Sequence, residues 1–150
     1  MTEVLFVCTL NIGRSAMAET IVNEVYGEDF HACSAGLCTS EEKPMCYDAR
    51  AALVRAGYDE KPLLCKISRR VDDEMMKKAD IIVGVTEAHA AALRDKYPAY
   101  AGKITTFPLA VNAPSADDAE GYDRCFKNLC DGIEKLLYPG GADKWKSKSE

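Results

Sequence analysis

The stretch from Val4 to Glu19, VLFVCTLNIGRSAMAE, constrains the fold more than any other part of the chain. It begins with an apolar run typical of a buried strand, continues as a short loop that starts at Cys8, and becomes helical from Arg14 onward. Cys8, Arg14 and Ser15 stand in the spacing Cys-x5-Arg-Ser. A strand–loop–helix turn of this length can wrap its backbone amides around one tetrahedral oxyanion. We therefore predict a phosphate-binding site with a cysteine nucleophile.

The residue types in this loop suit phosphoryl chemistry. Inward N–H groups and the N-terminus of the following helix favour the thiolate form of Cys8. Arg14 supplies a planar fork that fits two oxygens of a phosphate, a geometry that lysine cannot match. Ser15 can donate its hydroxyl to the Cys8 sulfur, and Asn11 tolerates left-handed backbone and can brace the loop. The residues expected around the phosphate are Thr9, Leu10, Asn11, Ile12, Gly13 and Arg14.

A plainer interpretation makes Cys8 a buried cysteine at the end of a strand and Arg14 a solvated helix residue. The bare pattern Cys-x5-Arg is short enough to occur by chance. Its position here, directly after a buried strand and directly before a helix, is what the chemistry requires. This context favours the phosphate site.

The size and charge of the chain set further bounds. At 150 residues it can bury a full core and suits one domain. We expect residues 1–138 to form that domain and residues 139–150 to be a flexible tail. The net charge of -5 offers no basic field for a nucleic acid, although amides and one arginine can still hold a small anion. The N-terminal apolar run is too short for a signal sequence or a membrane span, so no membrane partner is expected.

The seven cysteines follow no metal-binding or disulfide pattern. None forms a Cys-x2-Cys pair, and His31 and His89 are the two histidines available as further ligands. A structural zinc site or a disulfide framework is therefore disfavoured. Free thiols in a reducing cytoplasm fit best. The cysteines are Cys8, Cys33, Cys38, Cys46, Cys65, Cys125 and Cys130.

Strand and helix patterns alternate along the chain. Apolar runs predict strands at residues 3–7, 30–35, 80–85 and 104–107. Helical patterns cover residues 15–26, 46–56, 72–78 and 86–96, and a last helix starts at Asp117 or Asp118. Residues 63–68 stay ambiguous. The alternation predicts an α/β fold with a parallel sheet and helices on both faces. Ligands in such sheets bind beyond the carboxyl ends of the strands, which is where the loop after Cys8 lies.

The string CTLNIGRSAMAE resembles the N-terminal signature of the low-molecular-weight protein tyrosine phosphatases, a family shared with arginine phosphatases and arsenate reductases. The likeness extends over nearly the whole chain, with weaker matches at residues 34–36, 68–69 and 79–82 and at a Pro114 loop before Tyr122. The resemblance implies a three-layer sandwich with a four-stranded parallel sheet in the order 2-1-3-4 and the phosphatase loop after strand 1.

The resemblance also implies a two-step phosphoryl transfer. Cys8 attacks phosphorus and becomes a thiophosphate, which water then hydrolyses. Arg14 and the loop amides stabilise the transition state, so neither a metal nor a cofactor is needed. Ser15, Asn11 and Ser34 carry the family's supporting network. The implied partners are a phosphorylated protein and, in the loop, inorganic phosphate or a similar oxyanion.

One position departs from the family pattern where it matters most. The family places a general acid, the aspartate of an Asp-Pro pair, about nine residues before the helix tyrosine, and here that position is Ala113. Asp117 or Asp118 can serve instead from a rearranged loop, the protein can be an inactive or slow relative, or the alanine can be an engineered change that traps substrate. We favour the engineered change. The simpler role for both aspartates is helix capping.

Smaller departures concern the surroundings of the loop. Leu10 replaces a usual glycine, and Gly13 stands where many relatives carry a second, protective cysteine. Lys66 occupies a position where a histidine often supports the loop, and we expect it to be solvated. The segment 37–43 lacks the family's usual aromatic wall, for which Tyr47 is the nearest candidate.

Phosphotyrosine is the substrate that we expect. Phosphoarginine is the alternative, although its hydrolysis is associated with a threonine where this chain has Ile12. A weak or non-catalytic phosphate-binding relative is a further alternative, supported by Ala113. Arsenate reduction is disfavoured because it needs further cysteines in a segment that here, between Cys65 and Cys125, has none.

Overall fold

The computed structural model of the chain describes residues 1–39, 41–115 and 117–139. Its sheet has four parallel strands in the order β2-β1-β3-β4. The strands are β1 (Thr2–Cys8), β2 (Phe30–Gly36), β3 (Ile81–Gly84) and β4 (Ile104–Thr106). The predicted parallel sheet and its strand order are confirmed. Residues 140–150, most of the tail that we expected to be flexible, lie outside the described part of the chain.

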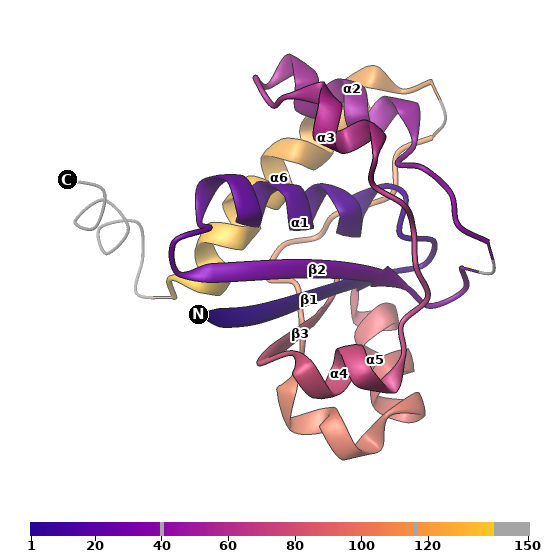
Figure 1. Cartoon of the computed structure of the whole chain (residues 1–150), viewed down its shortest axis with the longest axis vertical. Helices are drawn as coiled ribbons and strands as arrows, with labels where there is room; N and C mark the ends of the chain where they lie inside the picture. Colours follow the sequence, from indigo (N-terminus) through magenta and orange to yellow (C-terminus); the bar gives the residue numbers. More distant parts are fainter. Residues whose placement is uncertain (40, 116, 140–150) are drawn as a thin grey trace.

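Helices cover both faces of the sheet and complete a three-layer sandwich (Figure 1). One side carries α1 (Arg14–Val25), α2 (Tyr47–Arg55), α3 (Glu60–Leu64) and α6 (Ala119–Leu137). The other carries α4 (Asp73–Lys78), α5 (Glu87–Lys96) and the 3-10 helix η1 (Pro98–Lys103). Among the described residues, no helix has the length and apolar character that a membrane span requires.

Strand β1 lies between the two halves of the core because its successive side chains point to opposite faces. Val4 and Phe6 pack in the cluster that includes the buried residues of α1 and α6. Leu5 and Val7 pack in the cluster on the α4 and α5 side. Both faces of the strand are therefore dry. A continuous apolar run such as VLFV is typical of a strand that is covered on both faces. The sequence therefore predicts this strand correctly.

Two short elements, α3 and η1, were not predicted. Helix α3 has five residues and is capped by Asp59, whose side chain accepts a hydrogen bond from the Lys61 N–H. It falls partly in the stretch that the sequence left ambiguous, and it is too short to show a helical period. Helix η1 begins at Pro98, whose fixed φ suits a first helical position.

A close contact between β3 and α5 positions the second helical layer under the loop. A Cβ atom on Gly84 would lie 2.4 Å from the backbone nitrogen of Ala90, a distance that no side chain tolerates. Glycine therefore allows α5 to approach the end of β3 closely. This approach brings His89, in the first turn of α5, to the loop that follows Cys8.

Candidate active site

The loop between Cys8 and Arg14 lies where β1 ends and α1 begins, at the carboxyl edge of the sheet. It borders a cavity of about 300 Å³. The structure thus brings all the predicted phosphate-contacting residues around one cavity, together with residues from later elements. The described residues that line it are Cys8, Thr9, Leu10, Asn11, Ile12, Gly13, Arg14, Cys46, Ala113, Pro114 and Tyr122.

Neighbouring segments hold the carbonyl groups of the loop. The carbonyls of Cys8, Thr9, Leu10 and Ile12 accept hydrogen bonds of 2.6 to 3.0 Å from Leu37, Cys38, Thr39 and Cys46, respectively. In a planar trans peptide the next N–H points away from the carbonyl. The N–H groups that follow these carbonyls therefore point away from the neighbouring segments and toward the inside of the loop. This arrangement suits an oxyanion that accepts several backbone hydrogen bonds.

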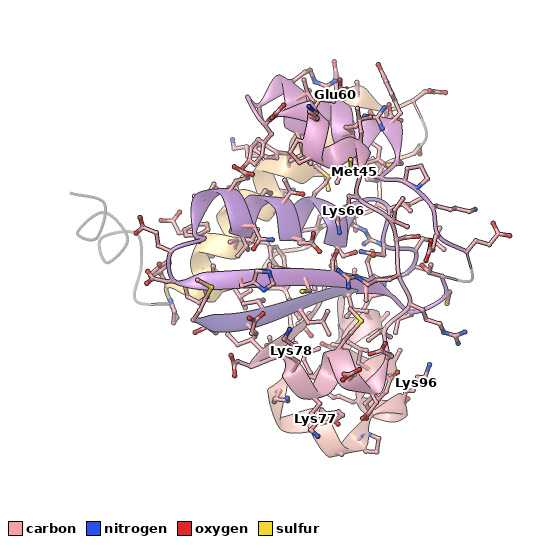
Figure 2. All side chains as sticks on the ribbon, in the orientation of Figure 1. Met45, Glu60, Lys66, Lys77, Lys78 and Lys96 are labelled. Carbon is pink, nitrogen blue, oxygen red and sulfur yellow. The ribbon has the colours of Figure 1, made fainter. Side chains whose placement is uncertain are left out.

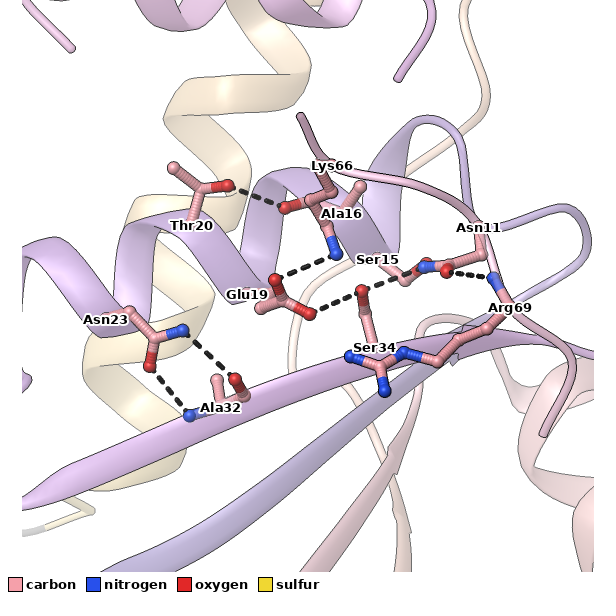
Figure 3. Close-up of polar contacts among 10 residues, drawn as sticks. All are labelled: Asn11, Ser15, Ala16, Glu19, Thr20, Asn23, Ala32, Ser34, Lys66 and Arg69. Atoms are coloured by element: carbon pink, nitrogen blue, oxygen red, sulfur yellow. Dashed lines mark hydrogen bonds and ion pairs between the residues drawn. The ribbon is translucent and has the colours of Figure 1, made fainter. Parts of the chain in front are cut away.

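Asn11 fixes the shape of the loop from behind. Its backbone is left-handed, with φ of 61°, and its side chain is buried. The amide nitrogen donates to the hydroxyl oxygens of Ser15 (2.9 Å) and Ser34 (2.8 Å), while the amide oxygen accepts from the Arg69 N–H (3.1 Å). Both amide hydrogens and the carbonyl oxygen are thus engaged (Figure 3). Asn11 braces the loop as predicted.

Ser15 connects this amide to the cysteine. Its hydroxyl oxygen lies 2.8 Å from the Cys8 sulfur. A thiolate sulfur can only accept, so with Cys8 in that form the Ser15 hydroxyl donates to the sulfur while its oxygen accepts from Asn11. Donation from Ser15 stabilises a negative charge on sulfur more than a neutral thiol.

Behind Ser34 the network ends in a shielded ion pair that the sequence did not predict. The Ser34 hydroxyl donates to one oxygen of Glu19 (2.9 Å), and the other oxygen lies 2.8 Å from the Lys66 ammonium. The side chains of Lys66 and Glu19 are 12% and 15% exposed. The expectation of a solvated Lys66 is therefore wrong. The residues next to Lys66 in the sequence do not predict its contact with Glu19, which lies on α1.

Lys66 differs in this respect from other lysines of the protein. Lys77 and Lys78 lie on α4 and Lys96 at the end of α5, all exposed and on the opposite side of the sheet (Figure 2). Lys66 instead faces α1, close to the loop (Figure 3). Its charge compensates the shielded Glu19 carboxylate, which is linked to the Cys8 sulfur by hydrogen bonds through Ser34, Asn11 and Ser15.

Arg14 is anchored to the loop that follows β4. One of its terminal nitrogens donates to the Val111 carbonyl at 2.9 Å. Arg14 lines the cavity, so its guanidinium is held at the edge of the space in which a phosphate fits. Half-buried guanidinium groups with one nitrogen anchored lose less freedom when they bind an oxyanion.

His89 is a contact of the loop that sequence reasoning missed. Its Nε2 lies 3.0 Å from the Thr9 hydroxyl, and its Nδ1 accepts from the Thr86 N–H at 3.1 Å. The neutral ring therefore carries its proton on Nε2, which donates to Thr9. Burial, and second the positive charge of Arg14, lower the pKa of His89. The sequence placed His89 three residues after the Thr86 cap but gave no hint that the ring reaches Thr9.

The wall of the cavity opposite the loop comes from α6 and from the start of α2. The Cys46 thiol donates to the Tyr122 hydroxyl at 3.6 Å, and burial raises the pKa of that hydroxyl. Tyr122 is the aromatic residue of the lining. Tyr47, the aromatic candidate from the sequence, is 71% exposed and is not among the lining residues.

The positions considered for a general acid lie in the segment before α6. Ala113 lines the cavity. Asp118 caps α6, since its carboxylate accepts the Gly121 N–H at 2.9 Å. Asp117 has a left-handed backbone and its N–H donates to the Asp48 carboxylate at 3.0 Å. Neither aspartate lines the cavity in this arrangement.

Comparison with known proteins identifies the family to which this site belongs. The sequence model described as "Low molecular weight phosphotyrosine protein phosphatase" matches residues 3–144. The chain belongs to this family. As a low-molecular-weight phosphatase it is a hydrolase with a cysteine nucleophile in the loop after β1, and the family acts on phosphorylated proteins.

Individual relatives of this phosphatase differ in their substrates. The low-molecular-weight protein tyrosine phosphatase from T. tengcongensis is 32% identical, with a TM-score of 0.82 over 91% of this chain and 98% of that one. A protein tyrosine phosphatase from Entamoeba histolytica is 27% identical, with a TM-score of 0.77 over 91% and 94%. A protein-arginine-phosphatase from Bacillus subtilis (strain 168) is 27% identical over 90% of this chain and 91% of its own.

The ion pair behind the loop yields a first test. Replacing Lys66 by methionine leaves the Glu19 carboxylate shielded and unpaired, which we expect to lower the free energy of unfolding by about 1–3 kcal/mol. The uncompensated charge also disfavours the Cys8 thiolate, so iodoacetamide should alkylate Cys8 more slowly at neutral pH. Lys66→Arg should restore both properties because it keeps the charge.

The matched control is Arg55→Met, which breaks the exposed ion pair with Asp123. It should cost less than about 1 kcal/mol in urea denaturation and leave the alkylation rate of Cys8 unchanged. Equal effects of Lys66→Met and Arg55→Met would mean that the Glu19–Lys66 pair does not support the loop.

The buried histidine yields a second test. Because the pKa of His89 is lowered in the folded protein, the unfolded chain binds more protons in the window between that lowered pKa and the ordinary value of about 6.5. Stability contributed by the neutral ring is therefore present above about pH 6.5 and is lost as the pH falls through that window. His89→Gln keeps a donor for Thr9 but does not titrate. Urea denaturation from about pH 7 to about pH 5 should show a smaller loss of stability in the variant, and parallel pH profiles would contradict this assignment.

Proposed function

We propose that this phosphatase hydrolyses phosphotyrosine in proteins through a cysteinyl-phosphate on Cys8. The observation that carries the proposal is the loop geometry. Its carbonyls are bound from outside, its N–H groups face inward, and the Cys8 sulfur sits at its start beside the Ser15 hydroxyl. Such a cradle holds a dianionic phosphoryl group in front of a thiolate without a metal ion.

The two steps follow from the positions of these groups. In the first, the Cys8 thiolate forms a bond to phosphorus while the bond from phosphorus to the tyrosine oxygen breaks, and that oxygen takes up a proton from solvent water. In the second, a water oxygen bonds to phosphorus and gives up a proton to solvent, the sulfur–phosphorus bond breaks, and inorganic phosphate leaves. Arg14 and the loop amides stabilise the charge on the transferring group in both steps. The Ser15 hydroxyl stabilises the thiolate, which is the leaving group of the second step.

Asn11 and Ser34 act on these steps indirectly. Neither is proposed to touch the phosphoryl group through its side chain. Asn11 holds Ser15 in the position from which its hydroxyl reaches the sulfur, and Ser34 fixes the second amide hydrogen of Asn11. We therefore assign both as positioning residues.

The chemistry of the cavity walls supports an aryl phosphate. Leu10, Ile12 and Pro114 contribute apolar surface, and Tyr122 offers a ring against which a phenyl group can pack. A phosphoarginine presents guanidinium N–H groups, which require acceptors such as a carboxylate. Among the described lining residues there is no carboxylate.

Phosphoarginine is the second candidate, and the protein-arginine-phosphatase relative is the observation that favours it. That relative is as similar in sequence as one of the tyrosine phosphatases. The two substrates make different demands on the cavity, because one places a ring and the other a charged planar group above the loop.

A direct comparison of the two substrates tests the preference. Peptides of one sequence carrying phosphotyrosine or phosphoarginine should differ in kcat/KM by roughly tenfold or more in favour of phosphotyrosine. Ile12→Thr should shift this ratio toward phosphoarginine by adding a hydroxyl to the wall. Leu10→Thr introduces the same side chain at another apolar loop position and should shift the ratio of the two kcat/KM values less. A higher kcat/KM for phosphoarginine would overturn the phosphotyrosine assignment.

The absent aspartate at position 113 gives a sharper prediction. An aspartate introduced by Ala113→Asp should raise the hydrolysis of phosphotyrosine by about 10²- to 10⁴-fold, the usual contribution of general acid catalysis. The gain should be smaller for p-nitrophenyl phosphate, whose leaving group is less basic. No gain on phosphotyrosine would show that another group already supplies the proton.

Two conservative variants identify that group if it exists. Asp117→Asn keeps a residue that tolerates left-handed backbone, and Asp118→Asn keeps an oxygen that can cap α6. Each removes an ionisable proton without removing the structural role. We expect neither to change kcat on phosphotyrosine by more than a few-fold, and a large loss in one of them would name it as the acid. If both variants and Ala113→Asp leave a barely active protein, the alternative of a phosphate-binding relative is preferred.

A further inference from the structure

Strand pairing brings three metal-ligating side chains together at the edge of the sheet. Glu3 of β1 is the register partner of His31 of β2, and Leu5 is the partner of Cys33. Residues two apart on a strand point to the same face, so Glu3, His31 and Cys33 share one face. Leu5, on that same face, packs in the cluster on the α4 and α5 side, against which Cys33 also packs. The side chains of His31 and Glu3 are partly exposed, so this end of the face is open to solvent.

The ligand atoms of these side chains lie within 4.8 Å of one another. Nδ1 of His31 is 2.7 Å from a carboxylate oxygen of Glu3. Around a tetrahedral zinc ion, bonds of about 2.0–2.3 Å place neighbouring ligand atoms some 3–4 Å apart. The observed cluster is therefore close to the required size. The side chains of His31 and Glu3 are 47% and 28% exposed, so an ion can reach them from solvent.

The backbone that carries Glu3 is held firmly. Its N–H donates to the Asp80 carboxylate at 2.8 Å, and its carbonyl accepts the Asp80 N–H at 2.8 Å. His31 and Cys33 are fixed by the ladder between β1 and β2. Ligands mounted on paired strands lose little freedom when an ion binds, which favours affinity.

The electrostatic surroundings contain charges of both signs. Burial chiefly raises the pKa of the Cys33 thiol; the charges of Glu19 and Glu3 act in the same sense, while Arg69 and Lys78 lower it. A bound cation displaces the thiol proton, and the resulting thiolate and the Glu3 carboxylate together balance the charge of a divalent ion.

We propose that Glu3, His31 and Cys33 form a binding site for one borderline-soft divalent cation, with Zn²⁺ as the representative ion. One thiolate, one imidazole and one carboxylate form a donor set that suits Zn²⁺ or Co²⁺, whereas Mg²⁺ and Ca²⁺ prefer oxygen ligands alone. Three protein ligands leave a fourth position for water or another ligand. Among the described residues, this is the one group of three or more His, Cys, Asp or Glu side chains whose ligand atoms lie close enough together to hold one ion. The proposal does not depend on the phosphatase activity.

The sequence lacks the closely spaced cysteines of a structural zinc site, which is why its pattern disfavours a metal. Here the spacing His-x-Cys supplies two ligands on one strand, and Glu3 joins them from a strand that lies far away in sequence. Without a metal, the contact between Glu3 and His31 is an ordinary surface ion pair or hydrogen bond. An experiment must therefore separate binding of an ion from this pair.

Cobalt spectroscopy makes that separation, because Co²⁺ takes the place of zinc and reports its ligands. The full chain carrying Cys8→Ser is used, so that the proposed nucleophile cannot bind the ion. One equivalent of Co²⁺ should give a near-ultraviolet thiolate-to-cobalt band and visible bands of a tetrahedral site, and Zn²⁺ should displace it. Cys33→Ser should abolish the thiolate band, whereas Cys65→Ser, at an exposed cysteine outside the cluster, should leave it intact.

The other two ligands are tested by affinity. Loss of an outer-shell partner typically weakens metal binding about 10–100-fold, and loss of a direct ligand should cost at least as much. His31→Ala and Glu3→Gln are therefore expected to weaken Zn²⁺ binding by roughly tenfold or more in calorimetric titrations. Both lie at the surface, so circular dichroism should show that the variants fold.

Thermal unfolding gives an independent readout. Excess Zn²⁺ should raise the Tm of the Cys8→Ser protein, because an ion that binds only the folded state stabilises it. The triple variant with Glu3→Gln, His31→Ala and Cys33→Ser should show no such rise. A cobalt thiolate band that persists in Cys33→Ser, or the absence of any Zn²⁺ binding to the Cys8→Ser protein, would overturn the proposal.

Discussion

The buried side-chain amide of Asn11 is the contact on which the phosphate loop depends. It joins the loop to helix α1 through Ser15, to strand β2 through Ser34, and to the segment before α4 through the Arg69 backbone. Gly36 at the end of β2 in turn donates to the Arg69 carbonyl at 2.8 Å. Each of these partners would be left with an unmet hydrogen bond if the amide were lost, at about 1–3 kcal/mol for a buried group. The left-handed backbone of Asn11 persists because these contacts hold it.

The loop can bind an anion because of the charges close to it, and the overall charge of the chain does not decide this. The chain carries a net charge of -5, yet the cavity is bordered by Arg14 and by inward backbone N–H groups. The neighbouring carboxylate, Glu19, is compensated by Lys66, and the nearby His89 ring stays neutral more readily because burial lowers its pKa. These features leave Arg14 and the backbone N–H groups as the groups that an incoming phosphoryl group meets at the loop. An anion then replaces water in a preformed set of donors.

The sequence predicted those features that depend on local pattern. The apolar run before Cys8, the left-handed tolerance of Asn11 and the cap at Asp118 all follow from neighbouring residues, and the sheet order followed from the family resemblance. The features that it missed depend on contacts between distant segments. Lys66 meets a carboxylate from α1, and His89 reaches the loop because Gly84 lets α5 approach. The cluster of Glu3, His31 and Cys33 exists because of the register between two parallel strands. No periodicity in the sequence predicts such contacts between distant segments.

The central claim is that Cys8 carries the phosphoryl group between the two steps, and chemical trapping measures it most directly. The protein is mixed with a phosphotyrosine peptide, quenched by acid within the first turnovers, digested, and examined by mass spectrometry. The account predicts that the peptide containing Cys8 gains the mass of one phosphoryl group and that Cys8→Ala shows neither this species nor release of phosphate. Release of phosphate by Cys8→Ala at the rate of the parent protein, or a phosphoryl group on another residue of the parent, would contradict it.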